Sequence, residues 1–228
     1  MAEIIVALDF ASADDAMSMV DLLGAEADFY KVGLELYTRA GPEIVRSLKQ
    51  TGRRVFLDLK LHDIPNTIVG GVRAAADLGV ELLTVHCSGG RAMLEAAGEA
   101  AAGRLEIMGV TLLTSLATED IEAVWGRIGV NMGDEVLRLG ALAREAGLSG
   151  VVASGSEVAR LKSELGPDFK VVTPGIRPAG SDVADQARVV TPAAAVASGS
   201  DYLVVGRPVT QAKDPAAALR LIREEATS

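Results

Sequence analysis

The chain has 228 residues, of which 49% are hydrophobic and only 4% aromatic, so it can bury one large core built mainly from aliphatic side chains. A formal net charge of −9, without a run of Lys or Arg, excludes a surface for non-specific nucleic-acid binding. The single cysteine, Cys87, excludes an internal disulfide framework. Because no apolar run could cross a bilayer and no N-terminal signal is recognisable, we expect a cytoplasmic protein without a membrane partner.

Short β-prone segments alternate with Ala- and Leu-rich helical segments along the chain. The expected strands are residues 4–8, 29–32, 55–59, 82–86, 107–113, 150–153, 170–173 and 202–205. The expected helices are residues 13–23, 42–50, 68–78, 92–102, 134–145, 156–164, 192–197 and 215–225. Ser12 followed by Asp15, and Asp214 before Pro215, are typical of helix starts. Residues 117–133 form the least regular connection, and we expect a mobile loop over one end of the fold there.

Strands that are nearly all apolar and separated by helices indicate parallel pairing with helical crossovers. Eight such units in a chain of this length predict an α/β fold, the (β/α)8 TIM barrel, as a single domain over residues 1–228. An open doubly wound sheet is the alternative. In the barrel, the active site would lie at the C-terminal ends of the strands.

Polar side chains do follow the expected strands at those ends. The richest stretch is RVFLDLKLHDIPNT, residues 54–67, where a strand places Asp58 and Lys60 on one face and Asp63 falls in the loop beyond. Other strands end near Asp9, Lys31, His86, Thr114 and Ser115. Since buried charge is costly unless paired, this coincidence favours a functional site over a chance ion pair on a solvated loop.

Two segments containing glycine and arginine follow the last two expected strands: Pro174-Gly175-Ile176-Arg177 and Gly206-Arg207-Pro208. Barrel enzymes often bind phosphate in the loops after strands seven and eight. Glycine lets backbone N–H groups approach an anion, and arginine can grip it with two hydrogen bonds. Gln186, between the two segments, could bridge phosphate and ligand ring. These segments predict a phosphorylated small-molecule ligand, and simple chain turns are the alternative.

Together these motifs resemble the orotidine 5′-monophosphate decarboxylase family in its bacterial form. The resemblance covers essentially the whole chain, through ALDF, KVGLELY, FLDLKLHDIPNT, VHCSGG, TLLTS, VTPGIRP, DQARV and VVGRPVT. It implies a carboxy-lyase that converts orotidine 5′-monophosphate to uridine 5′-monophosphate in de novo pyrimidine biosynthesis. It also implies that the enzyme uses no metal and no organic cofactor.

The resemblance further implies roles for single residues. Lys31, Asp58, Lys60 and Asp63 would form an alternating charge network, in which Lys60 stabilises and protonates the C6 carbanion. Asp63 would come from the neighbouring subunit, which makes the enzyme a homodimer with composite active sites. Asp9 and Thr67, the latter again from the neighbouring subunit, would bind the ribose hydroxyls. The other substrate-binding positions would be Thr114 or Ser115 at the pyrimidine, Arg177, Gln186, Gly206 and Arg207 at the phosphate, and Ile64 and Pro65 beside Asp63.

The sequence leaves two alternative functions open. The first is a Mg²⁺-dependent sugar-phosphate aldolase or decarboxylase of the same superfamily, but these relatives carry an acidic residue near the place of Lys31, where a cation would repel the metal. The second is a non-catalytic uridine-nucleotide-binding protein, which would have no need for the intact set of Asp58, Lys60 and Asp63.

Overall fold

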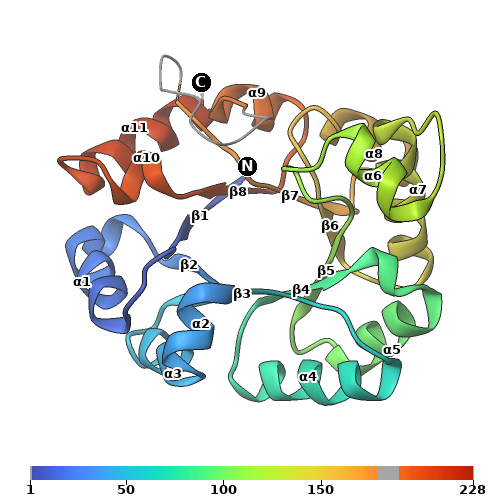
Figure 1. Cartoon of the computed structure of the whole chain (residues 1–228). Helices are drawn as coiled ribbons and strands as arrows, with labels where there is room; N and C mark the ends of the chain where they lie inside the picture. Colours follow the sequence, from blue (N-terminus) through green and yellow to red (C-terminus); the bar gives the residue numbers. More distant parts are fainter. Residues whose placement is uncertain (1, 179–189, 228) are drawn as a thin grey trace.

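The computed structural model describes residues 2–178 and 190–227, and its strands close into a barrel (Figure 1). The strands are β1 (Glu3–Ala7), β2 (Phe29–Gly33), β3 (Arg54–Leu61), β4 (Leu82–His86), β5 (Glu106–Val110), β6 (Gly150–Val152), β7 (Lys170–Thr173) and β8 (Tyr202–Val205). All pair in parallel with their neighbours in chain order, and β8 pairs with β1. The predicted barrel is confirmed, and the alternative of an open doubly wound sheet is wrong.

Helices connect the strands and surround the barrel (Figure 1). They are α1 (Ala13–Leu23), α2 (Leu34–Ala40), α3 (Glu43–Gln50), α4 (Pro65–Asp77), α5 (Arg91–Ala101), α6 (Thr118–Trp125), α7 (Met132–Glu145), α8 (Val158–Leu165), α9 (Pro192–Ala197), α10 (Arg207–Thr210) and α11 (Pro215–Thr227), with short 3-10 turns at Gly24–Glu26 and Cys87–Gly89. As predicted, Ser12 caps α1, where its hydroxyl accepts from the Asp15 N–H at 3.1 Å. Within the described ranges, no helix is both long and apolar enough to span a membrane.

Alternation along each strand divides the core into two layers. Outward side chains such as Leu57 and Leu83 pack against the helices in the larger cluster. Inward side chains fill the barrel; these are Ile5, Ala7, Phe29, Phe56, Leu82, Met108, Val172, Tyr202 and Val204. Since Phe56 points inward, the same period directs Asp58, two residues further along β3, toward the barrel axis.

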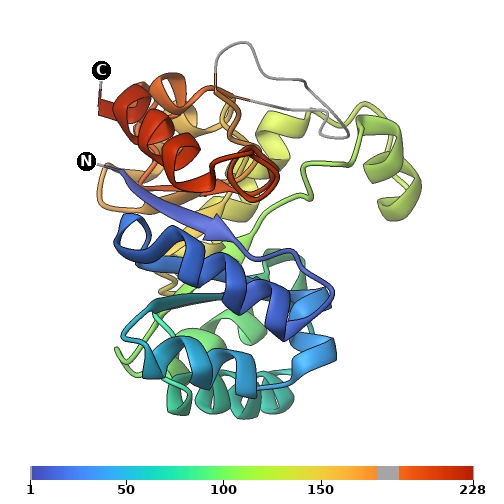
Figure 2. The same ribbon diagram turned by 90° about the vertical axis from the view of Figure 1, so that its left-hand side faces the viewer.

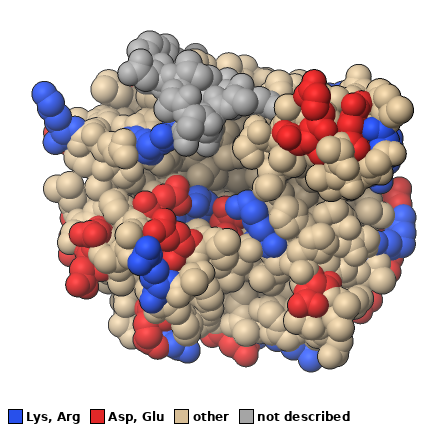
Figure 3. Space-filling model, in the orientation of Figure 1, with Lys and Arg blue, Asp and Glu red and all other residues tan. Residues whose placement is uncertain are grey.

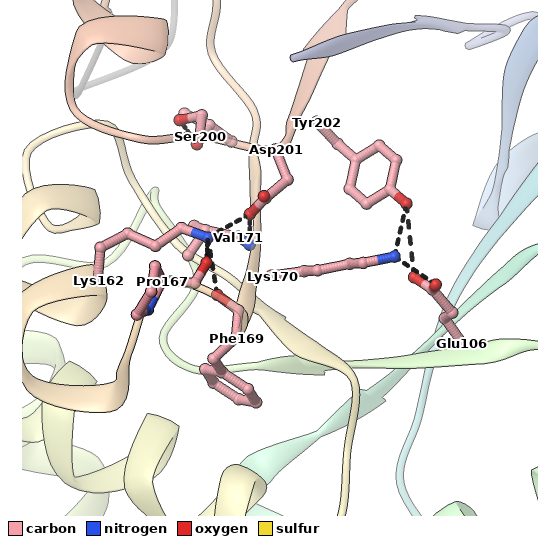
Figure 4. A network of polar contacts seen from close by, with 10 residues as sticks. Glu106, Lys162, Pro167, Phe169, Lys170, Val171, Ser200, Asp201 and Tyr202 are labelled. Atoms are coloured by element: carbon pink, nitrogen blue, oxygen red, sulfur yellow. Dashed lines mark hydrogen bonds and ion pairs between the residues drawn. The ribbon is translucent and has the colours of Figure 1, made fainter. Parts of the chain in front are cut away.

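Ion pairs secure the N-terminal ends of the strands (Figure 4). The Lys162 ammonium donates to Asp201 at 2.7 Å and to two main-chain carbonyls at 2.8 and 3.0 Å. The Asp201 carboxylate also accepts from the Val171 N–H at 2.6 Å, and Lys170 pairs with Glu106. In barrels of this kind, this end contributes stability, so the opposite end is the place to look for chemistry.

The prediction of a mobile loop over residues 117–133 is wrong, because part of this segment is a helix. Residues 117–133 contain α6, which stands out from the barrel in the side view (Figure 2). Local hydrogen bonds hold both ends of this helix: Asp120 accepts from the Ala117 N–H at 2.9 Å at its start, and Glu122 accepts from the Val130 N–H at 3.0 Å in the segment that follows it. The helix buries only Ile121 among its side chains, so it produces little hydrophobic periodicity in the sequence.

Several boundaries also differ from those expected. The fifth strand ends at Val110 instead of residue 113, because its pairing with β6 ends at Val152 and the chain bends at Leu112. α4 begins at Pro65 instead of residue 68, because proline is favourable at the first position of a helix. Thr67 therefore lies in the first turn of α4. α2 was not expected, because its seven residues bury only Leu36.

Candidate active site

A cavity of about 540 Å³ opens at the C-terminal ends of the strands, a size typical of small-molecule sites. In the view onto this face, Lys or Arg and Asp or Glu side chains gather in the central hollow (Figure 3). The apolar part of its wall is formed by Ala7, Phe56, Val110, Leu112, Leu113, Val152, Val172 and Val204. Of the predicted site residues, Asp9, Lys31, Asp58, Lys60, Thr114, Arg177, Gly206 and Arg207 line it.

Charges of opposite sign alternate across β1, β2 and β3. The Lys31 ammonium lies 2.9 Å from an Asp9 carboxylate oxygen and 3.8 Å from Asp58 Oδ2. Asp58 Oδ2 also accepts from the Lys60 ammonium at 2.8 Å. The side chains of Lys31 and Asp58 are only 11% and 13% exposed. Because a buried charge without a partner is strongly destabilising, the ion pairs that they form are required to keep both groups charged. The predicted neighbours Lys31, Asp58 and Lys60 therefore do come together.

Gly33 makes room for this network, a role that sequence reasoning missed. A Cβ atom at this position would lie 2.9 Å from the Lys31 ammonium nitrogen and 3.3 Å from an Asp9 carboxylate oxygen. Contacts that short would push the Lys31 side chain away from Asp9. The signal in the sequence was the glycine two residues after Lys31, on the same inward face of β2.

Lys60 has an unusual backbone, with φ at 51°, which is rare for a residue other than glycine. The register between β3 and β4 shifts between Leu57 and Leu61, so the irregularity includes Lys60. Thr84 of β4 contacts this point: its hydroxyl accepts from the Lys60 N–H at 2.8 Å and donates to Asp58 Oδ1 at 2.9 Å. Sequence reasoning missed Thr84, although a lone hydroxyl at an inward position of the apolar strand LLTVH could have indicated it.

Two histidines lie next to the charge network. The rings of His62 and His86 are 5.4 Å apart, and burial lowers the pKa of His86, with further contributions from the charges of His62 and Lys60. His86 therefore favours its neutral form. The next residue, Cys87, is fully buried, and burial raises the pKa of its thiol to about 12, which makes it an unreactive small apolar residue.

The predicted phosphate-binding segments meet on one side of the cavity. Gly175, Arg177, Gly206 and Arg207 all line it, and Gly175 has a φ of 77° that favours glycine. Arg177 is buried, and its guanidinium donates to the Ile176 carbonyl at 2.9 Å. Gln211, which follows α10, also lines the cavity and was not predicted. Gln186 lies outside the described residues.

The remaining predicted residues are on the outside of this chain. Asp63, Ile64, Pro65 and Thr67 are exposed and are not among the described residues that line the cavity. The Asp63 carboxylate accepts from the Ile64 N–H at 2.7 Å, and Ile64 is 66% exposed despite its apolar side chain. Ser115 is exposed as well, whereas its neighbour Thr114 lines the cavity. Among the described residues, no group of three or more His, Cys, Asp or Glu side chains could hold a metal ion.

The sequence is similar to those of known enzymes over nearly its whole length. The model of the Orotidine 5′-phosphate decarboxylase / HUMPS family matches residues 2–222. A relative from Vibrio parahaemolyticus, named orotidine 5′-phosphate decarboxylase, is 48% identical over 99% of this chain and 98% of its own length. A relative of the same name from Moorella thermoacetica is 51% identical over 98% of this chain and 91% of its own length.

Solved structures with the same fold lead to the same enzymes. The crystal structure of orotidine 5′-phosphate decarboxylase from Lactobacillus acidophilus matches with a TM-score of 0.88 and 38% identity, and covers 100% of both chains. That of the enzyme from Pyrococcus horikoshii matches with a TM-score of 0.80 and 27% identity over 99% of each chain. Sequence and fold therefore agree about what this chain is similar to.

Proposed function

The chain belongs to the orotidine 5′-phosphate decarboxylase / HUMPS family, and we propose that its central cavity is where it decarboxylates orotidine 5′-monophosphate to uridine 5′-monophosphate. It is a carboxy-lyase of pyrimidine biosynthesis, like the relatives that carry this name. The observation that carries the assignment to this cavity is the Lys31–Asp58–Lys60 network, which lines it together with apolar side chains.

The difficulty of the reaction lies in the electrons that CO₂ leaves behind. When the bond from C6 to the carboxylate breaks, its electron pair stays on C6 as a carbanion with little resonance stabilisation. A positioned ammonium group can stabilise this charge and then transfer a proton to C6, which leaves a neutral amine. In our assignment Lys60 would perform both tasks, and two observations support this choice: it lines the cavity, and its ammonium donates to Asp58.

Asp58 would act on the substrate before the bond breaks. Its carboxylate would lie near the substrate carboxylate, and two like charges about 4 Å apart at an effective dielectric of 20 repel by about 4 kcal/mol. Loss of CO₂ relieves this repulsion, so the repulsion lowers the activation barrier for decarboxylation. This requires that contacts with the ribose and the phosphate hold the pyrimidine ring in place against the repulsion. In our assignment, Asp9 holds the ribose, Thr114 the pyrimidine, and Arg177, Gly206 and Arg207 the phosphate, with Gln186 beside them.

The direct test is CO₂ release from orotidine 5′-monophosphate by the purified protein in the presence of a metal chelator. We expect rapid release that Mg²⁺ does not increase. Folded protein without this activity would contradict the proposed function. In that case, turnover of sugar phosphates with Mg²⁺ would identify the related aldolase or decarboxylase, and binding of uridine 5′-monophosphate without turnover would identify a binding protein.

We further propose that the active enzyme is a cytoplasmic homodimer whose sites are each completed by the second subunit. The segment from Asp63 to Thr67 supports this arrangement, because it follows Lys60 closely but points its side chains outward. It exposes the apolar Ile64 beside the charged Asp63, a combination expected of an interface. Asp63 and Thr67 would then contact the substrate bound by the other subunit.

Mixed dimers test the composite site. Lys60→Ala and Asp63→Ala chains are each expected to be nearly inactive alone. In a heterodimer, one site combines the intact Lys60 with the intact Asp63, so an equimolar random mixture should recover about a quarter of wild-type activity. The mixture is assayed after refolding together, with each variant refolded alone as control. Lack of recovery in mixtures proven to contain heterodimers would mean that both residues act within one chain.

A further inference from the structure

We propose that Thr84 is a positioning residue for decarboxylation, which holds both Asp58 and Lys60 in their working geometry. This inference rests on the proposed function, because it assigns the chemistry to those two side chains. Thr84 lies on β4, is fully buried, and is not among the described residues that line the cavity. It therefore acts through its neighbours and not on the substrate.

The Thr84 hydroxyl is both a hydrogen-bond acceptor and a hydrogen-bond donor. Its oxygen accepts from the Lys60 N–H at 2.8 Å, and its proton goes to Asp58 Oδ1 at 2.9 Å. One side chain thus joins the backbone of the proposed proton donor to the carboxylate beside it. Both hydrogen bonds join β4 to β3, so they fix the two strands relative to each other at the place where their register shifts, between Leu57 and Leu61.

The contact with Asp58 determines which way the carboxylate faces. Because Oδ1 accepts from Thr84, Oδ2 is directed toward the Lys60 ammonium at 2.8 Å and the Lys31 ammonium at 3.8 Å. The carboxylate torsion of Asp is broad, so packing alone would not fix this orientation. Loss of the hydroxyl would allow the carboxylate to rotate and change its distance to both lysines.

The contact with Lys60 supports a strained backbone. A residue other than glycine with a φ of 51° persists only where its surroundings hold it, and such residues cluster at functional sites. The Thr84 hydroxyl is the acceptor that the Lys60 N–H finds there. Without it, the backbone could relax and carry the ammonium group away from the reacting carbon.

Packing by itself does not require a hydroxyl at this position. The inward neighbour Leu82 is apolar, and valine has nearly the same shape as threonine with a high preference for strands. Thr84→Val should therefore keep the barrel filled while it removes both hydrogen bonds. Thr84→Ser keeps the hydroxyl and loses only a methyl group.

The test compares kcat and KM of these variants for orotidine 5′-monophosphate. We expect Thr84→Val to lower kcat about a hundredfold and to change KM less than about threefold, because misplacement of reacting groups by about 1 Å has effects of that size. Thr84→Ser should stay within about threefold of wild type. An unchanged kcat in folded Thr84→Val, or a change confined to KM, would overturn the inference.

Thr173→Val is the matched control. Thr173 is also fully buried, but it follows the inward-facing Val172 and therefore lies on the outward face of β7, where its hydroxyl pairs with Ser200 at 2.6 Å. Neither Thr173 nor Ser200 is among the described residues that line the cavity, so kcat of this variant should stay at the wild-type value. If Thr84→Val fails to fold, Thr84→Ser and Thr84→Ala replace it in the comparison, and equal loss of kcat in both would contradict a role for the hydroxyl. Wild-type protein is assayed in parallel, because its failure to release CO₂ would refute the proposed function and not this inference.

Discussion

Replacement of Lys60 by alanine is expected to lower kcat/KM for orotidine 5′-monophosphate by about five powers of ten, or about 7 kcal/mol of transition-state stabilisation. Proton transfer by a positioned acid typically contributes about 10²- to 10⁴-fold, and one preorganised charge or donor about 10²- to 10³-fold. Lys60 would supply both at once. Its removal also leaves Asp58, only 13% exposed, with Lys31, 3.8 Å away, as its remaining ion-pair partner within residues 2–178 and 190–227.

One variant separates the contribution of the charge from that of proton transfer, and a second variant is the control. Lys60→Arg keeps the positive charge but donates a proton poorly, so we expect an activity between those of Lys60→Ala and wild type. Lys49→Ala removes a lysine that pairs with Glu81 at 2.5 Å and lies outside the cavity, and it should leave kcat/KM unchanged. Single-turnover CO₂ release is the measurement. Activity of Lys60→Ala above about one per cent of wild type would contradict its role as the central acid.

Arg207→Ala is expected to lower kcat/KM by about three powers of ten, or about 4 kcal/mol. Arg207 begins α10, directly after β8, on the side of the cavity where Arg177 and Gly206 also lie. A guanidinium there would bind the substrate phosphate through charge-assisted hydrogen bonds. Because phosphate binding would hold the pyrimidine against repulsion by Asp58, the loss should appear in kcat as well as in KM.

A substrate without phosphate provides the decisive control. With orotidine, wild type and Arg207→Ala should have similar, low activity, because the group that Arg207 binds is absent. Arg39→Ala, which removes an exposed arginine of α2 paired with Glu35, should behave as wild type with both substrates. The assignment of Arg207 would be wrong if its removal reduced turnover of orotidine and of the nucleotide by the same factor.

Local pattern was enough to predict the barrel. Apolar β-prone runs and helical segments recur along the chain, which favours a closed (β/α)8 barrel, and the pairing of β8 with β1 excludes the open doubly wound sheet. α6 was not predicted because it buries only Ile121 and so shows little hydrophobic periodicity. α2 was not predicted because it has only seven residues. Gly206 and Arg207 were predicted beside Arg177, because the barrel brings the ends of β7 and β8 together.

By itself, then, the sequence determined the barrel and the residue types at the C-terminal ends of its strands, because period-two alternation and helix starts are local properties of the chain. Only the tertiary structure decided that Thr84 joins Asp58 to Lys60, that Gly33 leaves space for Lys31, and that residues 63–67 are exposed and do not line the cavity of their own chain. These facts depend on the register between neighbouring strands and on the left-handed backbone of Lys60. Neither follows from local pattern, because contacts between residues 24 or 26 positions apart are set by how whole strands align.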